Sequence, residues 1–238
     1  MEFLRRKKIP LLIIAILSCL CLILIPKKLS REPKITPDLT PPIERVLPSP
    51  TYSSHISIEE ALKKRRSIRQ YKNQAITLQQ VAQLLWASQG ITSNEGFRTT
   101  PSAGALYPLE VYLVARNVSN LSAGVYHYVP SKHILQKIKE GDISAQLTRA
   151  ALGQSTVNSG AANIVITAVF SRTIKKYGKL GNRFVFMEAG HAAQNIYLQT
   201  VSLNLATVSI GGFDDVQVKQ ALGITNEEPL YILPIGKK

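Results

Sequence analysis

Two stretches near the start of the folded part of the chain have apolar residues at helical spacing, and each follows a capping box. The boxes are Ser57–Glu60 and Thr77–Gln80. In such a box the first and fourth side chains satisfy the free amides at a helix start. We therefore expect a short helix that ends near Lys64 and a second helix that ends near Ser88, before Gly90.

Further along, short apolar and β-branched runs predict strands, and longer runs at helical spacing predict helices. Strands are expected at residues 111–115, 125–128, 134–138, 164–170, 208–210 and 230–235, with a hairpin between the second and third. Helices are expected at residues 143–152, 184–203 and 216–222. Because strands and helices mix without a regular strand–helix–strand rhythm, the pattern favours an α+β fold over a doubly wound sheet.

The N-terminal segment follows a different pattern. Basic residues 5–8 precede an apolar run from Ile9 to Ile25, and Lys27 and Lys28 follow it. Such a run, of about 17 residues, has the minimum length for a membrane span. A cleaved signal peptide is the alternative, although no Ala-x-Ala site follows Ile25. We expect residues 1–28 to be a transmembrane anchor of a single-pass membrane protein whose domain lies outside the cytoplasm.

Residues 29–54 contain six prolines. Prolines at this density leave little room for a helix or a central strand, and they make a chain semi-extended. We expect this stretch to be a linker that holds the domain away from the membrane. The domain itself is expected to cover residues 55–238.

Composition and charge narrow the classes of partner. Hydrophobic residues make up 45% of the chain and charged residues 18%, which suffices for a core. The net charge of +14 favours anionic partners such as phosphate groups, acidic lipids or nucleic acid. No nucleic-acid partner is expected, because much of the charge flanks the N-terminal apolar run and no basic stripe alternates with aromatic residues. The two cysteines, Cys19 and Cys21, both lie in that run, so the domain has no thiol nucleophile.

Several common catalytic motifs are absent from the sequence. It contains no G-x-G-x-x-G motif, no phosphate-binding G-x-x-x-x-G-K-[ST] loop and no G-x-S-x-G elbow. The four histidines show no metal-ligand spacing, so no metal is expected. If the protein is an enzyme, a cofactor must carry its chemistry.

The segment Arg65-Arg66-Ser67-Ile68-Arg69 lies at the end of the first predicted helix. Three guanidinium groups and a hydroxyl within five residues are what binding of a phosphate monoester requires. The alternative is a solvated basic helix end, which the helix dipole also favours.

Three further segments could approach a ligand closely. The first, R-T-T-P-S-A-G-A-L-Y-P at residues 98–108, is a stiff loop of small residues whose uncovered backbone could hydrogen-bond a flat ring. The second, Gly211-Gly212, permits close approach of a ligand. The third is the basic tail with Lys237, which could reach a phosphate. Ordinary turns and a solvated tail are the alternatives.

In this order the segments resemble the nitroreductase family, and in particular its SagB/ThcOx-type branch. The resemblance covers residues 55–238 and rests on R-R-S-x-R, P-S-A-G-A-L-Y-P, G-H-A-A-Q-N, G-G-F and a final strand with G-K. It implies a nitroreductase-like mixed sheet flanked by helices. It also implies that FMN is bound non-covalently between the two subunits of a homodimer.

The resemblance also assigns roles to residues. It implies that the phosphate and ribityl chain are held by Arg65, Arg66, Ser67 and Arg69, with Lys237 near the phosphate. The flavin ring is expected to face Pro101, Ser102, Ala103, Gly104 and Leu106, contributed by the partner subunit, with Gly211 and Gly212 also near the ring. Glu188, His191 and Asn195 match family positions, with a structural role as the alternative to a ligand role.

The implied activity is that of an FMN-dependent oxidoreductase. A donor reduces the flavin, which then passes electrons on, so that hydride moves between the donor and a small-molecule or peptide substrate. Some family members oxidise azoline heterocycles in modified peptides with a Lys-Tyr pair, and Lys176 and Tyr177 occupy that place as expected catalytic residues. The alternatives are a solvated basic loop at this position, a non-catalytic flavin-binding or sensing protein, and a peripheral membrane adaptor.

Overall fold

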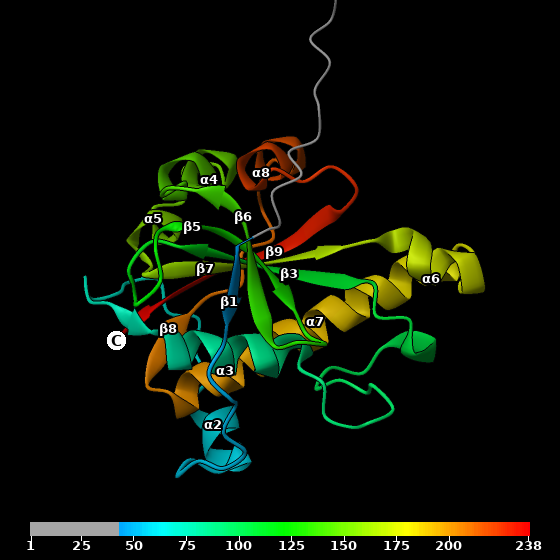
Figure 1. The fold of residues 1–238 in the computed structure, drawn as a ribbon, viewed down its shortest axis with the longest axis horizontal. Coiled ribbons are helices and arrows are strands. Elements are labelled where there is room, and N and C mark those ends of the chain that lie inside the picture. The colour runs from blue at the N-terminus through cyan, green and yellow to red at the C-terminus, as the bar shows by residue number, and fades with distance from the viewer. Residues whose placement is uncertain (1–42) are drawn as a thin grey trace, which may run out of the picture. The chain divides into compact units, whose positions relative to one another are not determined.

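The computed structural model describes residues 43–238, and a seven-stranded sheet forms the centre of this part of the chain (Figure 1). The strand order is β1–β6–β5–β3–β7–β9–β8, and each neighbouring pair is antiparallel. The strands are β1 (Glu44–Val46), β3 (Leu109–Ala115), β5 (Gly124–Val129), β6 (Ile134–Glu140), β7 (Ala162–Ala168), β8 (Leu205–Thr207) and β9 (Glu228–Lys237). Two short strands, β2 (Ile76–Thr77) and β4 (Val118–Ser119), pair in parallel in a separate sheet.

Helices cover both faces of the large sheet (Figure 1). On one face lie α3 (Leu78–Gln89) and α7 (Leu180–Ser202), with α2 (Ile58–Lys64) packed on α7. On the other lie α4 (Ser144–Ala150), α5 (Thr156–Ser159) and α8 (Asp215–Leu222). This double cover explains why every residue of β7 is buried and why most of its sequence is apolar. The predicted α+β class is confirmed.

The helix starts that the capping boxes predicted are confirmed. The hydroxyl of Ser57 accepts a hydrogen bond from the Glu60 amide at the start of α2, at 3.1 Å. At α3 both halves of the box form, because Thr77 and Gln80 each accept from the other's backbone amide. These signals are local, so the sequence suffices to place them.

Between β7 and α7 the structure differs from the prediction. The strand ends at Ala168, and residues from Phe170 form a further helix, α6 (Phe170–Tyr177), which packs on α7. A turn at Gly178, where φ is +56°, separates the two helices, and α7 starts at Leu180 rather than at residue 184. Lys176 and Tyr177 therefore lie in the last turn of a helix and not in a loop.

The short strand expected at residues 208–210 lies earlier in the chain. Strand β8 covers Leu205–Thr207, where it pairs with the end of β9. Ile210 makes only an isolated bridge with Ile232. The physical reason is that pairing with β9, and not local propensity, decides which residues of this run become a strand.

Part of the proline-rich stretch packs against the rest of the domain. Residues Glu44–Val46 form the edge strand β1 beside β6, and Leu47 is buried. Farther on, the buried Gln83 of α3 binds the backbone of Thr51: its amide oxygen accepts from the Thr51 N–H and its amide nitrogen donates to the Thr51 carbonyl. Prolines limit strand interiors but not an edge strand or an extended segment held by side chains.

The expected localisation requires a correction. We expected a single-pass membrane protein with its domain outside the cytoplasm. In the part of the chain that the structure describes, no helix has the length and apolar character needed to cross a bilayer, which contradicts that localisation. The predicted anchor at residues 1–28, and the predicted linker before residue 43, lie outside the described residues.

Candidate functional site

The arginine-rich segment after α2 lies directly against the C-terminal strand. The backbone N–H of Ile68 donates to the Thr207 carbonyl at 2.9 Å, and that of Lys72 donates to the Lys237 carbonyl at 3.0 Å. Gly236 makes this close approach possible, since a Cβ at that position would lie 2.5 Å from the Cβ of Tyr71. The predicted phosphate-binding segment and the predicted basic tail are thus neighbours.

A tyrosine that the sequence analysis did not single out joins this segment to the glycine pair. The hydroxyl of Tyr197, on α7, lies 2.9 Å from the Ser67 hydroxyl and accepts a hydrogen bond from the Ser209 amide at 2.8 Å. The Arg65 guanidinium lies over the Tyr197 ring, 5.1 Å from its centre. Burial raises the pKa of Tyr197, but hydrogen bonds with Ser209 and Ser67 and the charge of Arg65 outweigh it and lower that pKa overall.

Open space surrounds the other groups at this place. Arg66 and Arg69 are exposed, and Arg66 donates to the backbone carbonyls of Lys63 and Arg65. A Cβ at Gly212 would meet no atom within 4 Å, and one at Gly211 would meet only the Tyr231 ring, at 3.7 Å. We call the group that gathers here the basic half-site; it comprises Arg65, Arg66, Ser67, Arg69, Tyr197 and Lys237. Gly211 and Gly212 lie farther along β9, because Ile210 bridges Ile232 and Gly211 faces the Tyr231 ring.

The predicted ring-facing loop, residues 101–107, has an unusual backbone. Gly104 has a φ of +62°, and the non-glycine residues Ala105 and Tyr107 also have positive φ, at +53° and +45°. Left-handed conformations at such residues cost energy and are often found at functional sites. A side chain at residue 104 would displace its neighbours, since a Cβ there would lie 2.7 Å from the Tyr177 hydroxyl and 2.9 Å from the Lys176 Nζ.

The structure therefore brings the predicted Lys-Tyr pair to the predicted ring-facing loop. Lys176 is exposed, and Tyr177 is half-buried against Phe184, with the two rings at 90°. The same helix is attached to the loop at its first turn. Arg172 donates to the Tyr107 carbonyl at 3.0 Å and pairs with the Glu110 carboxylate at 2.6 Å. We call residues 101–107 together with Lys176 and Tyr177 the loop half-site.

Partly buried polar side chains support this loop. Arg98 stacks on the Tyr107 ring, 4.4 Å from its centre, and donates to the side-chain oxygen of Gln89 at 2.8 Å. Asn195, on α7, donates to the Thr99 carbonyl and the Thr100 hydroxyl, so it holds the loop and has a structural role here. His191 is exposed on the same helix.

Glu188 belongs to the same buried group and is 2% exposed. Burial raises the pKa of its carboxyl to about 7, although Ser102, the charge of Arg98 and Gln89 act in the opposite direction. A carboxyl with such a pKa can hold a proton at neutral pH. The sequence analysis identified Glu188 only as a family position, because no pattern in the neighbouring residues indicates that its side chain is buried.

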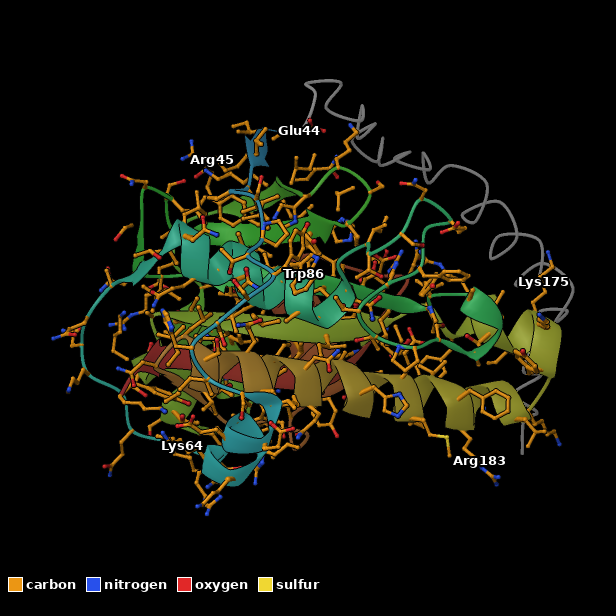
Figure 2. All side chains as sticks on the ribbon, turned by 90° about the horizontal axis from the view of Figure 1, so that it is seen from below. Glu44, Arg45, Lys64, Trp86, Lys175 and Arg183 are labelled. Atoms are coloured by element: carbon orange, nitrogen blue, oxygen red, sulfur yellow. The ribbon has the colours of Figure 1, made fainter. Side chains whose placement is uncertain are left out.

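The two half-sites lie at opposite ends of the sheet. Lys237 is the last residue of β9, whereas Glu228, its first residue, pairs with Ala168 just before α6. Ten residues of strand at about 3.3 Å each span roughly 30 Å. Figure 2 shows the same separation, with Lys64 at the end of α2 and Lys175 on α6 at opposite ends of the domain. Within one subunit the predicted binding residues thus form two groups.

A cavity of about 480 Å³ lies elsewhere, between residues 51–58 and the helices α3 and α7. Tyr52 and Trp86 line it and meet edge to face, with their ring centres 5.5 Å apart. None of the residues expected to bind phosphate or the flavin ring lines this cavity. In residues 43–238 no cluster of three or more His, Cys, Asp or Glu side chains is placed to hold a metal ion.

Comparisons with known proteins bear on the family and the fold of the chain. Residues 62–237 match the Nitroreductase family. A nitroreductase-family protein of Methanocaldococcus jannaschii, MJ1384, is 42% identical over 183 residues, which is 77% of this chain and 92% of that protein.

Two solved structures share the fold. A nitroreductase-family structure from Anabaena variabilis superposes with a TM-score of 0.73 at 30% identity, over 82% of this chain and 42% of that chain. The Escherichia coli microcin synthetase McbBCD complex, solved with truncated pro-MccB17 bound, superposes with a TM-score of 0.64 at 26% identity. That match covers 82% of this chain and 78% of the other.

Proposed function

The chain belongs to the nitroreductase family, and from this premise we propose that it is an FMN-dependent oxidoreductase whose flavin lies between the two subunits of a homodimer. When bound, FMN supplies a ring that takes up and gives back a hydride. The protein supplies the phosphate-binding groups, the surface under the ring and the groups that handle a substrate proton.

The observation that carries the proposal is the separation of the two half-sites along β9. Phosphate-binding donors gather at one end of the sheet, and the loop that suits a flat ring lies at the other, roughly 30 Å away by strand length. A second subunit related by a two-fold axis could place its loop half-site beside the basic half-site of the first. Each dimer would then hold two equivalent flavins.

The residues of the basic half-site fit a flavin phosphate. Arg65, Arg69 and Lys237 supply positive charge, and guanidinium groups make strong bonds to phosphate oxygens. Ser67 is a neutral donor already fixed by Tyr197. The open backbone at Gly211 and Gly212, near Tyr231 of β9, would leave room for a ring farther from the phosphate. The basic half-site therefore matches the phosphate in charge.

An exposed apolar strip supports the homodimer. Leu180, Phe186 and Met187 of α7 are each more than half exposed, and Ile174 of α6 is 37% exposed. Apolar side chains grouped on one face often mark a protein interface. The strip adjoins the loop half-site through α6, so a second copy of the chain that covered it would also lie close to the proposed flavin.

For the chemical step we propose that Lys176 and Tyr177 act on the substrate. Both polar atoms lie at Gly104, in the loop proposed to face the ring. From there the Lys176 Nζ, after losing its own proton to solvent, would take a proton from the substrate, and the Tyr177 hydroxyl would donate a hydrogen bond to the substrate. Neither step requires a group outside this chain other than the flavin, the substrate and solvent.

The substrate is proposed to be a small molecule or a peptide, in line with the SagB/ThcOx-type branch. Similarity to the microcin synthetase complex, which was solved with truncated pro-MccB17 bound, supports a peptide. The exposed position of Lys176 at the end of α6 supports it too, because an extended chain could reach it.

Mixing of half-site variants tests the shared site. Arg69→Ala removes a donor from the basic half-site, and Gly104→Val obstructs the loop half-site. Each variant alone should bind FMN poorly at a concentration that saturates the wild type. A heterodimer purified from cells that express both carries one doubly defective site and one intact site, so it should recover about half of the wild-type flavin.

The matched control combines Arg69→Ala with Lys237→Ala, two changes in the same half-site, which should not complement. If the heterodimer of Arg69→Ala and Gly104→Val binds no more FMN than either parent, the flavin is not shared between subunits in the proposed way.

A further inference from the structure

Three unpartnered polar atoms lie together below the ring-facing loop. Among the described residues, the Glu188 Oε1, the Gln89 Nε2 and the Arg98 Nε are buried and make no hydrogen bond. Buried polar groups are nearly always paired, so each such atom needs an explanation. The three side chains are neighbours, since Gln89 and Arg98 are among the groups that act on the Glu188 carboxyl.

The Ser102 hydroxyl connects this network to the loop backbone. Its oxygen accepts a hydrogen bond from the Tyr107 amide at 2.9 Å, which closes the loop around residues 103–106. A serine oxygen that accepts still has its own hydrogen to donate. Glu188 is the acidic group that the Ser102 side chain meets. An ionised Glu188 would accept a hydrogen bond from the Ser102 hydroxyl, whereas a neutral Glu188 could donate a hydrogen bond to the Ser102 oxygen.

We infer that Glu188 is a positioning residue whose protonation state sets the conformation of the loop through Ser102. The inference rests on the proposed function, in which this loop faces the flavin ring. An ionised Glu188 would fix the Ser102 hydroxyl toward α7 and draw the Arg98 guanidinium away from Tyr107. A neutral Glu188 leaves Arg98 stacked on Tyr107, as the structure has it.

The charged groups around Glu188 agree with a switch of this kind. Arg98, from the loop, is the charge that acts on Glu188 directly. On β3 and α6, Glu110 and Arg172 act on Arg98 and are paired with each other. On α7 itself, His191 lies one turn beyond and is exposed.

Also on α6, Lys176 lies at Gly104 of the loop.

Burial is the largest effect on the Glu188 carboxyl and raises its pKa to about 7, so its ionised and neutral states are both populated near neutral pH. The loop geometry would therefore respond to pH in the physiological range.

Nuclear magnetic resonance of the full chain tests this without flavin. With ¹³C-labelled glutamate and ¹⁵N-labelled tyrosine, the Glu188 carboxyl signal, assigned by its loss in Glu188→Gln, should titrate near pH 7. The Tyr107 amide signal should shift with the same midpoint in the wild type and stay flat in Glu188→Gln. Glu95→Gln, which changes an exposed carboxyl in the preceding turn, should leave both titrations unchanged. The inference is overturned if the Tyr107 signal does not shift with pH in the wild type, or if it still shifts with pH in Glu188→Gln.

Ser102→Ala provides a second variant that keeps the acid. Here the Glu188 signal should still titrate while the Tyr107 response is lost. A Tyr107 response that persists in Ser102→Ala overturns the route through Ser102.

Flavin binding then links the loop to the cofactor. Because FMN itself titrates in this range, the ratio of the Kd of Glu188→Gln to that of the wild type is measured at each pH. The ratio should change by at least about fivefold between pH 5.5 and 8.5, the lower end of typical coupling between sites. A constant ratio with normal FMN binding overturns the inference alone. If the wild type binds no FMN, the proposed function fails, while the titration of Tyr107 still reports on Glu188.

Discussion

The Tyr177 hydroxyl lies against Gly104: a Cβ built on Gly104 would be only 2.7 Å from it. The two residues are 73 positions apart in sequence (177 − 104) and come from a helix and a strained loop. Their contact is what places the Lys-Tyr pair on the proposed flavin-facing surface. It also makes Gly104 a sensitive point for testing that arrangement.

Gly104→Ala should destabilise the protein by more than its backbone conformation alone accounts for. An alanine at φ +62° costs about 1–2 kcal/mol, and the methyl group must also displace the Tyr177 hydroxyl and the Lys176 Nζ. Adding Tyr177→Phe should recover the part that is due to the hydroxyl. Unfolding in urea of the wild type, both single variants and the double variant measures the coupling.

Gly141→Ala is the matched control for that cycle. Gly141 also has a positive φ, +84°, but a Cβ there would meet no atom within 4 Å. Its cost should not depend on residue 177. Additivity of Gly104→Ala and Tyr177→Phe would mean that the hydroxyl does not lie against the loop.

Arg65→Ala and Arg69→Ala should each weaken FMN binding by roughly 1.5–3 kcal/mol, the usual range for a charge-assisted hydrogen bond. Fluorescence titration of the apoprotein with FMN measures the change. Arg149→Ala, which removes an exposed arginine from α4, should bind FMN like the wild type. If all three variants keep the wild-type affinity, the arginine segment is only a solvated basic surface.

Lys176→Ala and Tyr177→Phe should keep FMN but slow the reduction of the flavin by its substrate. Neither side chain belongs to the basic half-site, so affinity should change little, whereas general acid–base groups typically contribute about 10²–10⁴-fold to rate. Stopped-flow absorbance at the flavin band follows the reduction. Lys175→Ala, one position earlier and exposed, is the control. Wild-type rates in both variants would exclude a catalytic role for the pair.

The stability of the protein should depend on pH through Glu188. Its pKa is raised from 4.5 to about 7 in the folded state, so between these values the folded protein holds a proton that the unfolded chain has released. The stabilising contribution is present in full below pH 4.5 and is lost as the pH rises through 7. The loss amounts to roughly 3 kcal/mol at most.

Urea unfolding of the wild type and of Glu188→Gln at a series of pH values isolates this term. The difference in unfolding free energy between the two proteins should shift in favour of the glutamine variant as the pH rises from 4.5 to 7. A difference that does not vary with pH would show that the Glu188 carboxyl titrates alike in the folded and unfolded states.

Local signals in the sequence predict much of the fold. The helix caps at Ser57 and Thr77 and the strand β7 can be recognised from the residues next to them in sequence. The position where β7 ends cannot be recognised in this way, because apolar residues continue through Phe170 into α6. Pairing of Ala168 with Glu228, 60 residues later, ends the strand there. Because this pairing joins residues that are distant in sequence, no local pattern predicts where the strand ends.

The same distinction applies to the candidate site. Arginine, serine and glycine types in the motifs predict what each segment could bind. Tyr197 was missed because its partners, Ser67 and Ser209, come from distant segments. The separation of the two half-sites follows from the direction of β9, which no motif encodes. The surroundings of Glu188 likewise come from distant segments, with Gln89 on α3 and Arg98 and Ser102 in the segment before β3.

The most direct test of the account is the visible absorption spectrum of the purified full-length protein before and after anaerobic reduction. The account predicts the two bands of an oxidised flavin, loss of both on addition of a reductant, and their return when an electron acceptor is admitted. A protein that carries no flavin, and takes up none when incubated with FMN, would contradict it.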